Sequence, residues 1–171
     1  MSSPVSITKR MRSWKAGSIA ELRYQRCYPK ARKSSRAEDI FMHVDFWHGD
    51  IGVDVKGNNL PDEIWIEFKN VRGEPGWVFG EATYIAFDIP ELHGFALVER
   101  QELQNYCHQN VDFSGLVAKQ DAYKKCYQRK DREDLITKLI LQDLQELKSF
   151  TITEYCATYF HPESGEICYV S

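Results

Sequence analysis

The chain has 171 residues, of which 43% are hydrophobic and 13% aromatic, enough for one globular domain with its own core. No apolar run approaches the roughly 18–20 residues of a membrane-spanning helix, and the basic start lacks the apolar region of a secretory signal. We therefore expect no membrane partner. Five scattered cysteines without a CxxC pair favour reduced thiols, and hence the cytoplasm, over disulfides or a zinc site.

The net charge of −3 hides a strong asymmetry along the chain. Residues 1–36 hold ten Lys or Arg, among them Arg32 and Lys33, against one acid, Glu21. The remainder carries a net charge of −12. This pattern favours a nucleic-acid-binding segment over a merely solubilising surface. Aromatic residues that could stack on bases lie among these charges: Trp14, Tyr24 and Tyr28.

Local patterns predict the elements in chain order. Ser18-Ile-Ala-Glu21 is a capping-box pattern, which predicts a helix from Ser18 to about Tyr28, closed by Pro29. After it we expect a polar linker, three short strands within 42–70, a glycine-rich loop at 70–82, strands at 83–89 and 94–100, a helix at 101–109, a helical stripe within 131–150, and a hairpin of 151–160 with 165–171. The mixture indicates an α/β (α+β) fold, one domain over residues 1–171 with a basic N-terminal segment at 1–36.

The three short strands read HVDFW, IGVDVKG and IWIEFKN, and each carries an acid at its centre. Successive side chains of a strand point to opposite faces, so one face of the predicted sheet is apolar and the other collects charge. The residues of the second face are His43, Asp45, Trp47, Asp54, Lys56, Trp65, Glu67 and Lys69. A solvated sheet face is one interpretation, and a catalytic row is the other.

Strand register favours the catalytic row. The turn HGD places Asp45 opposite Asp54, and a hairpin at NNLPDE would place Asp54 opposite Glu67. Opposed carboxylates repel one another, so the row calls for a cation, and hard oxygen ligands suit Mg²⁺ or Mn²⁺. Lys56 lies one step away on the same face, where it could hold a water or stabilise phosphate charge.

Asp45, followed by Asp54-Val55-Lys56 after a helix bearing Glu21, resembles the PD-(D/E)XK nuclease superfamily over roughly residues 18–100. That superfamily includes many restriction endonucleases, archaeal Holliday junction resolvases and phage recombination nucleases. The resemblance implies a restriction-endonuclease-like core, a mixed sheet of about five strands flanked by helices. It also implies hydrolysis of DNA phosphodiester bonds with Mg²⁺ or Mn²⁺, a homodimer, and a host cytoplasm if a phage encodes the chain.

The superfamily motif assigns the metal-ligand aspartate to Asp45, the second acidic position to Asp54 and the lysine to Lys56. No proline precedes Asp45, which departs from a common form of the motif. A rival alignment uses Asp54 with Glu67 and Lys69. We prefer the first, because a glycine turn after GVDVKG leaves its lysine near a strand end, with Glu67 as a third carboxylate.

Two further residues have alternative roles. Glu21 is either a capping residue of its helix or a metal ligand. His43 shares the charged face, where it either binds metal, as in some RNA-cleaving members of the superfamily, or packs.

Other segments offer contacts to nucleic acid. In the loop GEPGWVFG, Trp77 and Phe79 either plug the sheet edge or stack on bases. The cluster YKKCYQRKDR at 123–132 is either a basic helix face against phosphates or a solvated face. The candidate nucleic-acid contacts are Arg32, Lys33, Lys69, Arg72, Trp77, Lys124, Lys125 and Arg129.

Two functions are consistent with these patterns. The first is a metal-dependent nuclease acting on DNA in recombination, repair or restriction. The second is a catalytically silent module of the same fold that binds nucleic acid or a protein partner. The aligned acids favour the enzyme, because a silent module has no need to keep them together.

Overall fold

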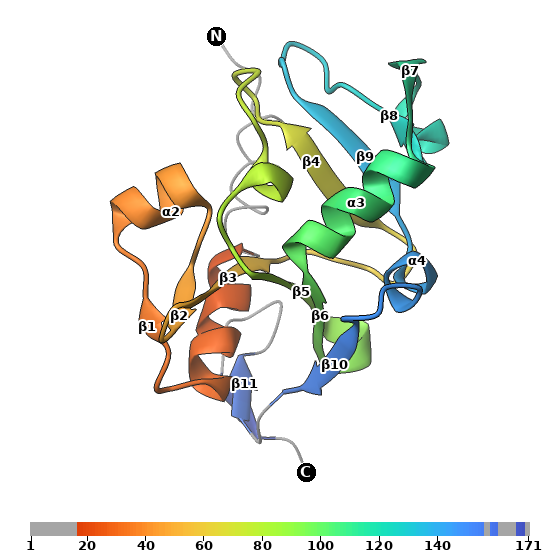
Figure 1. The fold of residues 1–171 in the computed structure, drawn as a ribbon. Helices are drawn as coiled ribbons and strands as arrows, with labels where there is room; N and C mark the ends of the chain where they lie inside the picture. Colours follow the sequence, from red (N-terminus) through yellow and green to blue (C-terminus); the bar gives the residue numbers. More distant parts are fainter. Residues whose placement is uncertain (1–16, 156–157, 161–166, 170–171) are drawn as a thin grey trace, which may run out of the picture.

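The computed structural model describes residues 17–155, 158–160 and 167–169, with side chains described as far as residue 155. A helix occupies residues 17–27. The elements that follow are β1 (Arg32–Lys33), α2 (Arg36–Met42), β2 (Phe46–His48), β3 (Ile51–Lys56), β4 (Ile64–Lys69), η1 (Trp77–Phe79), β5 (Tyr84–Ile89), η2 (Pro90–Leu92), β6 (Gly94–Glu99), α3 (Arg100–Asn110), β7 (Asp112–Leu116), η3 (Lys119–Asp121), β8 (Lys125–Cys126), β9 (Leu135–Leu139), α4 (Leu141–Gln145), β10 (Thr151–Glu154), β11 (Thr158–Phe160) and β12 (Ile167–Tyr169) (Figure 1).

The main sheet has six strands in the order β1-β2-β3-β5-β6-β10. β3 and β5 run parallel, and the other neighbouring pairs are antiparallel. The predicted mixed sheet flanked by helices is thus confirmed, with six strands where we expected about five. The described strands β4–β9, β7–β8 and β11–β12 form three separate pairs.

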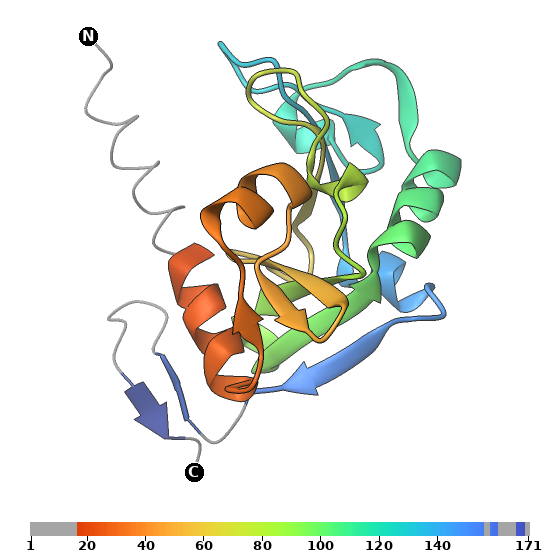
Figure 2. The same ribbon diagram turned by 60° about the vertical axis from the view of Figure 1, so that its left-hand side comes forward.

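Both faces of the main sheet are covered. One face is covered by the helix at 17–27 (Figure 2). Tyr24 of this helix packs with Val53, Val55 and other residues of a small core. On the other, α3, η1 and the β4–β9 pair contribute to a larger core that includes Phe87. The interpretation of the charged face as merely solvated is therefore wrong, and Asp54 lies in the interior, 2% exposed.

β4 is not the third strand of a meander. It pairs antiparallel with β9, and the place beside β3 that we predicted for it belongs to β5. Ile64 and Ile66 are fully buried, so β4 forms a layer over the sheet instead of extending its edge. The segment 57–83 is consequently the crossover between two parallel strands, and such a connection has to be long.

Two predicted helices are absent from the described chain. The apolar stripe within 131–150 is β9 followed by the short helix α4, and Leu135 and Leu139 are spaced so that they share a face in a helix and in a strand alike. Because residues 135–139 pair with β4, this part of the segment forms a strand and not a helix. The basic segment 123–132 contains β8 and turns, so its lysines and arginines do not share a helix face.

Other expectations are confirmed. β5, β6 and α3 lie where they were predicted, and β11 pairs antiparallel with β12 as the expected C-terminal hairpin, whose turn at 161–166 lies outside the described residues. β10, predicted as part of that hairpin, joins β6 instead. The helix α2 was not predicted, although Ser35 and Glu38 form a capping box at its start.

No helix in the described part of the chain has both the length and the apolar composition required to cross a membrane. Cys107 and Cys126 are free thiols, and the side chains of Cys156 and Cys168 lie outside the described set.

Candidate active site

The carboxylates of Asp45 and Asp54 lie close together beside the β2–β3 hairpin, although the two residues do not form a strand pair. The paired register ends at Phe46–Val53, and the backbone N–H of Asp45 donates to the carbonyl oxygen of Val53 (2.9 Å), so the predicted pairing of Asp45 directly opposite Asp54 is not observed. Asp45 lies just before β2, and its Oδ2 accepts a hydrogen bond of 2.7 Å from the backbone N–H of Val55. This bond fixes one carboxylate beside the other.

The Asp54 carboxylate is buried, and only one of its two oxygens has a polar partner among the described residues. Its Oδ1 lies 2.9 Å from Nζ of Lys56, while its Oδ2 has no hydrogen-bond partner among the described residues. Burial raises the pKa of Asp54 well above its usual value; the Asp45 charge adds to the effect and Lys56 opposes it. A buried carboxylate oxygen without a partner is costly, and a cation or a proton relieves the cost.

The Lys56 ammonium is held from several sides. It lies 5.1 Å from the ring centroid of Trp77 as well as beside Asp54, and its side chain is 27% exposed. Burial lowers the pKa of Lys56, but the charges of Asp54, Asp45 and Glu67 raise it, and together they hold it above the ordinary value. Lys56 is therefore a cation at neutral pH with a path to solvent.

Glu67 approaches Lys56 by a route that the sequence did not predict. Because β4 pairs with β9, Glu67 does not lie opposite Asp54, and the proposed row of three carboxylates in one sheet is wrong. Glu67 instead comes from the overlying layer, where its carboxylate accepts the backbone N–H of Trp77. Burial raises the pKa of Glu67, and the Lys56 charge lowers it.

Glycine allows the loop after β4 to press against this region. A Cβ on Gly76 would lie 2.3 Å from the carbonyl oxygen of Glu67, and one on Gly80 would lie 2.8 Å from Cβ of His43. Both contacts are closer than side chains tolerate. The glycines of GEPGWVFG thus bring η1 between β4 and the end of α2.

The helix at 17–27 and α2 add two carboxylates near Asp45. Burial and the Asp45 charge raise the pKa of Glu21 and of Asp39. Gly17 is already helical, so Ser18 is not an N-cap and the capping role considered for Glu21 is excluded. Glu21 forms an ion pair of 3.4 Å with Lys33.

Asp39 is the residue that sequence reasoning missed. The capping-box pattern from Ser35 to Glu38 would have revealed its helix. His43 ends that helix in a left-handed conformation with φ of 53°. Burial and the Lys56 charge lower the pKa of His43, while the charges of Asp39 and Asp45 oppose this shift.

The aromatic residues proposed to stack on nucleic acid fall into three groups. Trp77 is 6% exposed beneath the Lys56 ammonium, so it packs and cannot stack on a base, whereas Phe79 is 48% exposed. Tyr24 is buried, with its hydroxyl 2.7 Å from Nε2 of His48. Trp14 lies outside the described residues.

Several basic candidates have protein partners. Lys124 forms a 2.8 Å ion pair with the buried Asp143, and Arg129 binds the buried Asp134. Arg32 makes two hydrogen bonds to Glu38, of 2.8 and 3.0 Å. Lys124 and Arg129 thus neutralise buried acids, which argues against their assignment as phosphate contacts. Exposed candidates remain at Lys33, Lys69, Arg72 and Lys125.

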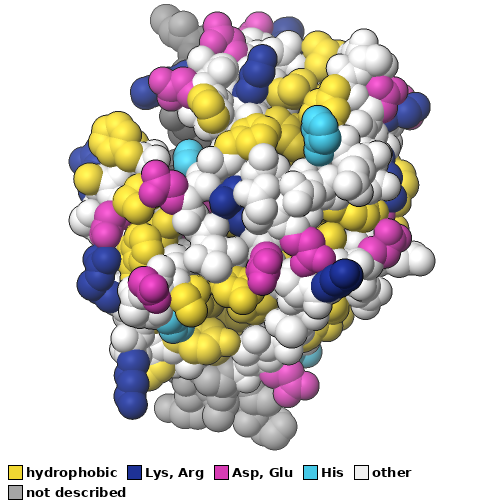
Figure 3. Space-filling view, viewed as in Figure 1, with side chains coloured by type: hydrophobic (Ala, Val, Ile, Leu, Met, Phe, Trp, Pro, Cys, Tyr) yellow, Lys and Arg dark blue, Asp and Glu magenta, His cyan; other side chains and the backbone are white. Residues whose placement is uncertain are grey.

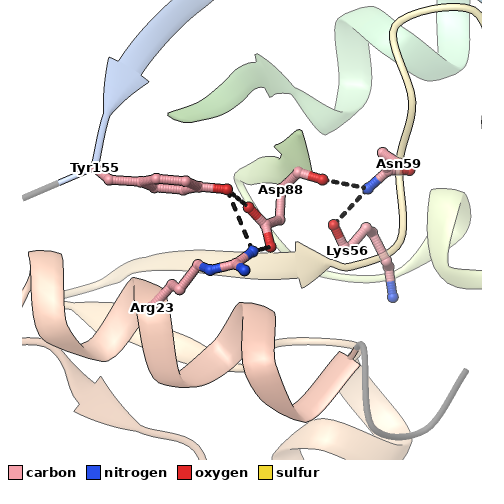
Figure 4. Close-up of polar contacts among 5 residues, drawn as sticks. All are labelled: Arg23, Lys56, Asn59, Asp88 and Tyr155. Atoms are coloured by element: carbon pink, nitrogen blue, oxygen red, sulfur yellow. Dashed lines mark hydrogen bonds and ion pairs between the residues drawn. The ribbon is translucent and has the colours of Figure 1, made fainter. Parts of the chain in front are cut away.

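A second buried polar network supports the end of β3. Arg23 from the helix at 17–27 lies 2.5 Å from Oδ2 of Asp88, whose Oδ1 accepts a hydrogen bond from the Tyr155 hydroxyl (Figure 4). The amide of Asn59 donates to the backbone oxygens of Lys56 (2.6 Å) and Asp88 (3.3 Å). The backbone of Lys56 is therefore tied to this network.

No three His, Cys, Asp or Glu side chains within the described ranges are grouped so that they could hold a metal ion by themselves. The pair Asp45 and Asp54 nevertheless suits Mg²⁺, which commonly binds through one or two carboxylates and retains several waters. The partnerless Oδ2 of Asp54 supplies a hard oxygen donor for such an ion.

Comparisons with protein families, curated proteins and solved structures returned no significant match to this chain.

Proposed function

We propose that the chain is a metal-dependent nuclease that hydrolyses phosphodiester bonds in DNA. The observation that supports this most directly is the buried Asp54 carboxylate, close to Asp45 and beside Lys56, with one oxygen lacking a partner among the described residues. Retaining neighbouring acids in an interior lowers stability unless they bind something.

In this proposal Asp45 and Asp54 hold Mg²⁺ or Mn²⁺. When bound, such an ion polarises a phosphate oxygen and lowers the pKa of a coordinated water. The backbone N–H of Val55 keeps Asp45 oriented toward the shared position. Glu21 and Asp39 raise the negative potential around Asp45 and contribute to attracting the ion.

Lys56 is assigned to the phosphate. Its ammonium is charged, partly exposed and restrained by Asp54 and the Trp77 ring, so it is preorganised to stabilise the charge that develops on the phosphate oxygens. Glu67 holds the backbone N–H of Trp77 and thereby keeps that ring beneath the ammonium. Glu67 thus has two roles in this proposal. It positions Lys56 through Trp77, and it is a third carboxylate of the site.

The test is cleavage of linear, branched and single-stranded DNA in Mg²⁺, in Mn²⁺ and in EDTA. Wild type should cut in either metal and not in EDTA, and Asp45→Asn and Asp54→Asn should each abolish cutting while folding survives. Asp50→Asn, an exposed acid in the turn of the same hairpin, is the matched control and should retain activity. Full activity in both site variants would rule out this site.

The alternative is a silent module that binds nucleic acid. It is favoured by the lack, among the described residues, of three side chains grouped to hold a metal ion. Binding of DNA by wild type without cleavage in either metal would support this alternative.

A further inference from the structure

Aromatic side chains surround a pocket at the far end of β4. The pocket has a volume of about 390 Å³ and is lined by Phe68, Lys69, Gly73, Pro75 and Phe79. The ring centroids of Phe68 and Phe79 are 6.4 Å apart, and Phe113 of β7 lies edge-on to Phe68 at 4.9 Å. Figure 3 shows hydrophobic side chains gathered in this upper part of the face, where Figure 1 places β4 and the following loop.

The rings are unusually accessible for their size. Phe79 is 48% and Phe113 46% exposed, while Phe68 between them is buried and fixes their arrangement. Pockets of a few hundred Å³ lined by aromatic residues suit small flat ligands. A planar group entering here would meet ring faces and edges, the contacts on which nucleobases stack.

Charge at the rim favours a polyanion over an apolar protein side chain. Lys69 and Arg72 are exposed, and neither forms an ion pair within the described part of the chain. Glu133 lies beside Gly73. Phosphates are therefore expected along the Lys69 side of the pocket and away from Gly73.

The pocket adjoins the candidate active site through the chain itself. Glu67, which faces Lys56, is followed directly by the pocket residues Phe68 and Lys69, and the loop that carries Phe79 also supplies the Trp77 N–H bound by Glu67. Glu67 and Phe68 point to opposite faces of β4, and Lys69, which shares the face of Glu67, also lines the pocket, so Lys69 connects the side of the site with the pocket.

We propose that this pocket, which we call the Phe68–Phe79 pocket, binds an unpaired nucleobase of the substrate strand. The proposal rests on the nuclease function above and narrows its substrate to single-stranded or branched DNA, because a base within an intact duplex cannot enter. Phe79 of the pocket stacks on the base, Phe113, which packs edge-on against Phe68 beside the pocket, extends the aromatic surface, and Lys69 binds the adjoining phosphate.

The test measures binding separately from cleavage. Fluorescence anisotropy of labelled oligo(dT) and of a duplex of equal length, both in EDTA, gives affinities without hydrolysis. Phe79→Ala and Phe113→Ala should each weaken oligo(dT) binding by about tenfold and change duplex binding little. Phe41→Ala, which removes an 80% exposed ring on α2, is the control and should bind like wild type.

Three other outcomes would overturn the pocket proposal. Unchanged oligo(dT) binding by both pocket variants, with normal melting curves, overturns the pocket proposal; if wild type still cleaves DNA in Mg²⁺, the nuclease proposal survives it. Equal losses on oligo(dT) and duplex also overturn it. A dimer in sedimentation velocity that Phe79→Ala dissociates would identify the surface as a contact between copies, which again overturns the proposal.

Discussion

Asp54 links the stability of the protein to its proposed chemistry. Its carboxylate is buried, its pKa is raised, and one of its oxygens has no partner within the described residues. A site that binds a cation needs such a group to ionise, whereas the metal-free fold favours the protonated form. The pH dependence of Asp54 ionisation should therefore differ between the metal-free and the metal-bound protein.

We first predict that metal-free stability falls as pH rises above the ordinary aspartate pKa of 3.8. In that range the folded state retains a proton on Asp54 that the unfolded state has lost, so unfolding becomes more favourable with each increase in pH up to the raised pKa. Asp54→Asn keeps the shape and removes this slope. Melting curves in EDTA across pH 4–8 should show a flatter profile and a higher melting temperature at neutral pH for the variant. Parallel profiles would contradict the assignment, and Asp50→Asn should follow wild type.

The second prediction contrasts two lysines. Lys56→Ala should lower single-turnover cleavage by about 10²–10⁴-fold with little change in DNA affinity, because its contact matters mainly in the transition state. Lys69→Ala should weaken binding and reduce the salt dependence by about one phosphate contact. Salt-titrated binding and single-turnover rates on both variants are the measurements. The rival alignment requires the reverse pattern.

At the scale of elements, local geometry explains which expectations succeeded. Phe46 pairs with Val53 across a tight turn, so turn length alone brings the neighbouring Asp45 and Asp54 close together. Glu67 could not be placed in this way, because the partner of β4 is β9, about 70 residues later. Leu135 and Leu139 fit both periodicities, and only that distant pairing decides between them.

Our third prediction concerns the connection between the helix at 17–27 and β5. Arg23→Met leaves the Asp88 carboxylate buried without its cation and should cost about 3–5 kcal/mol of unfolding free energy. The double variant Arg23→Met/Asp88→Asn should recover part of that loss, because the uncompensated charge is gone. Urea denaturation of wild type, both single variants and the double variant measures the coupling. Strictly additive effects would show that the pair is not coupled.

At the scale of the whole molecule, metal binding should appear as thermal stabilisation. A ligand that binds only the folded state at about 100 times its Kd should raise the melting temperature of a chain of this size by about 5–10 °C. We expect this shift with Mg²⁺ or Mn²⁺ in wild type and much less of it in Asp54→Asn. Calorimetry that finds equal metal binding by both proteins would exclude the carboxylate pair as the site.

The crossover from β3 to β5 carries Glu67, η1 and the Phe68–Phe79 pocket, while Asp45, Asp54 and Lys56 belong to the sheet beneath it. In the proposed function, most of the reaction chemistry and the contacts to the substrate base would thus lie in separate stretches of sequence, with Glu67 shared between them. Replacement of Pro75 and Phe79, with Trp77 and its flanking glycines retained, is expected to change substrate preference and leave the residues around Lys56 intact. Substitution at these positions offers a route to altered specificity within an unchanged scaffold.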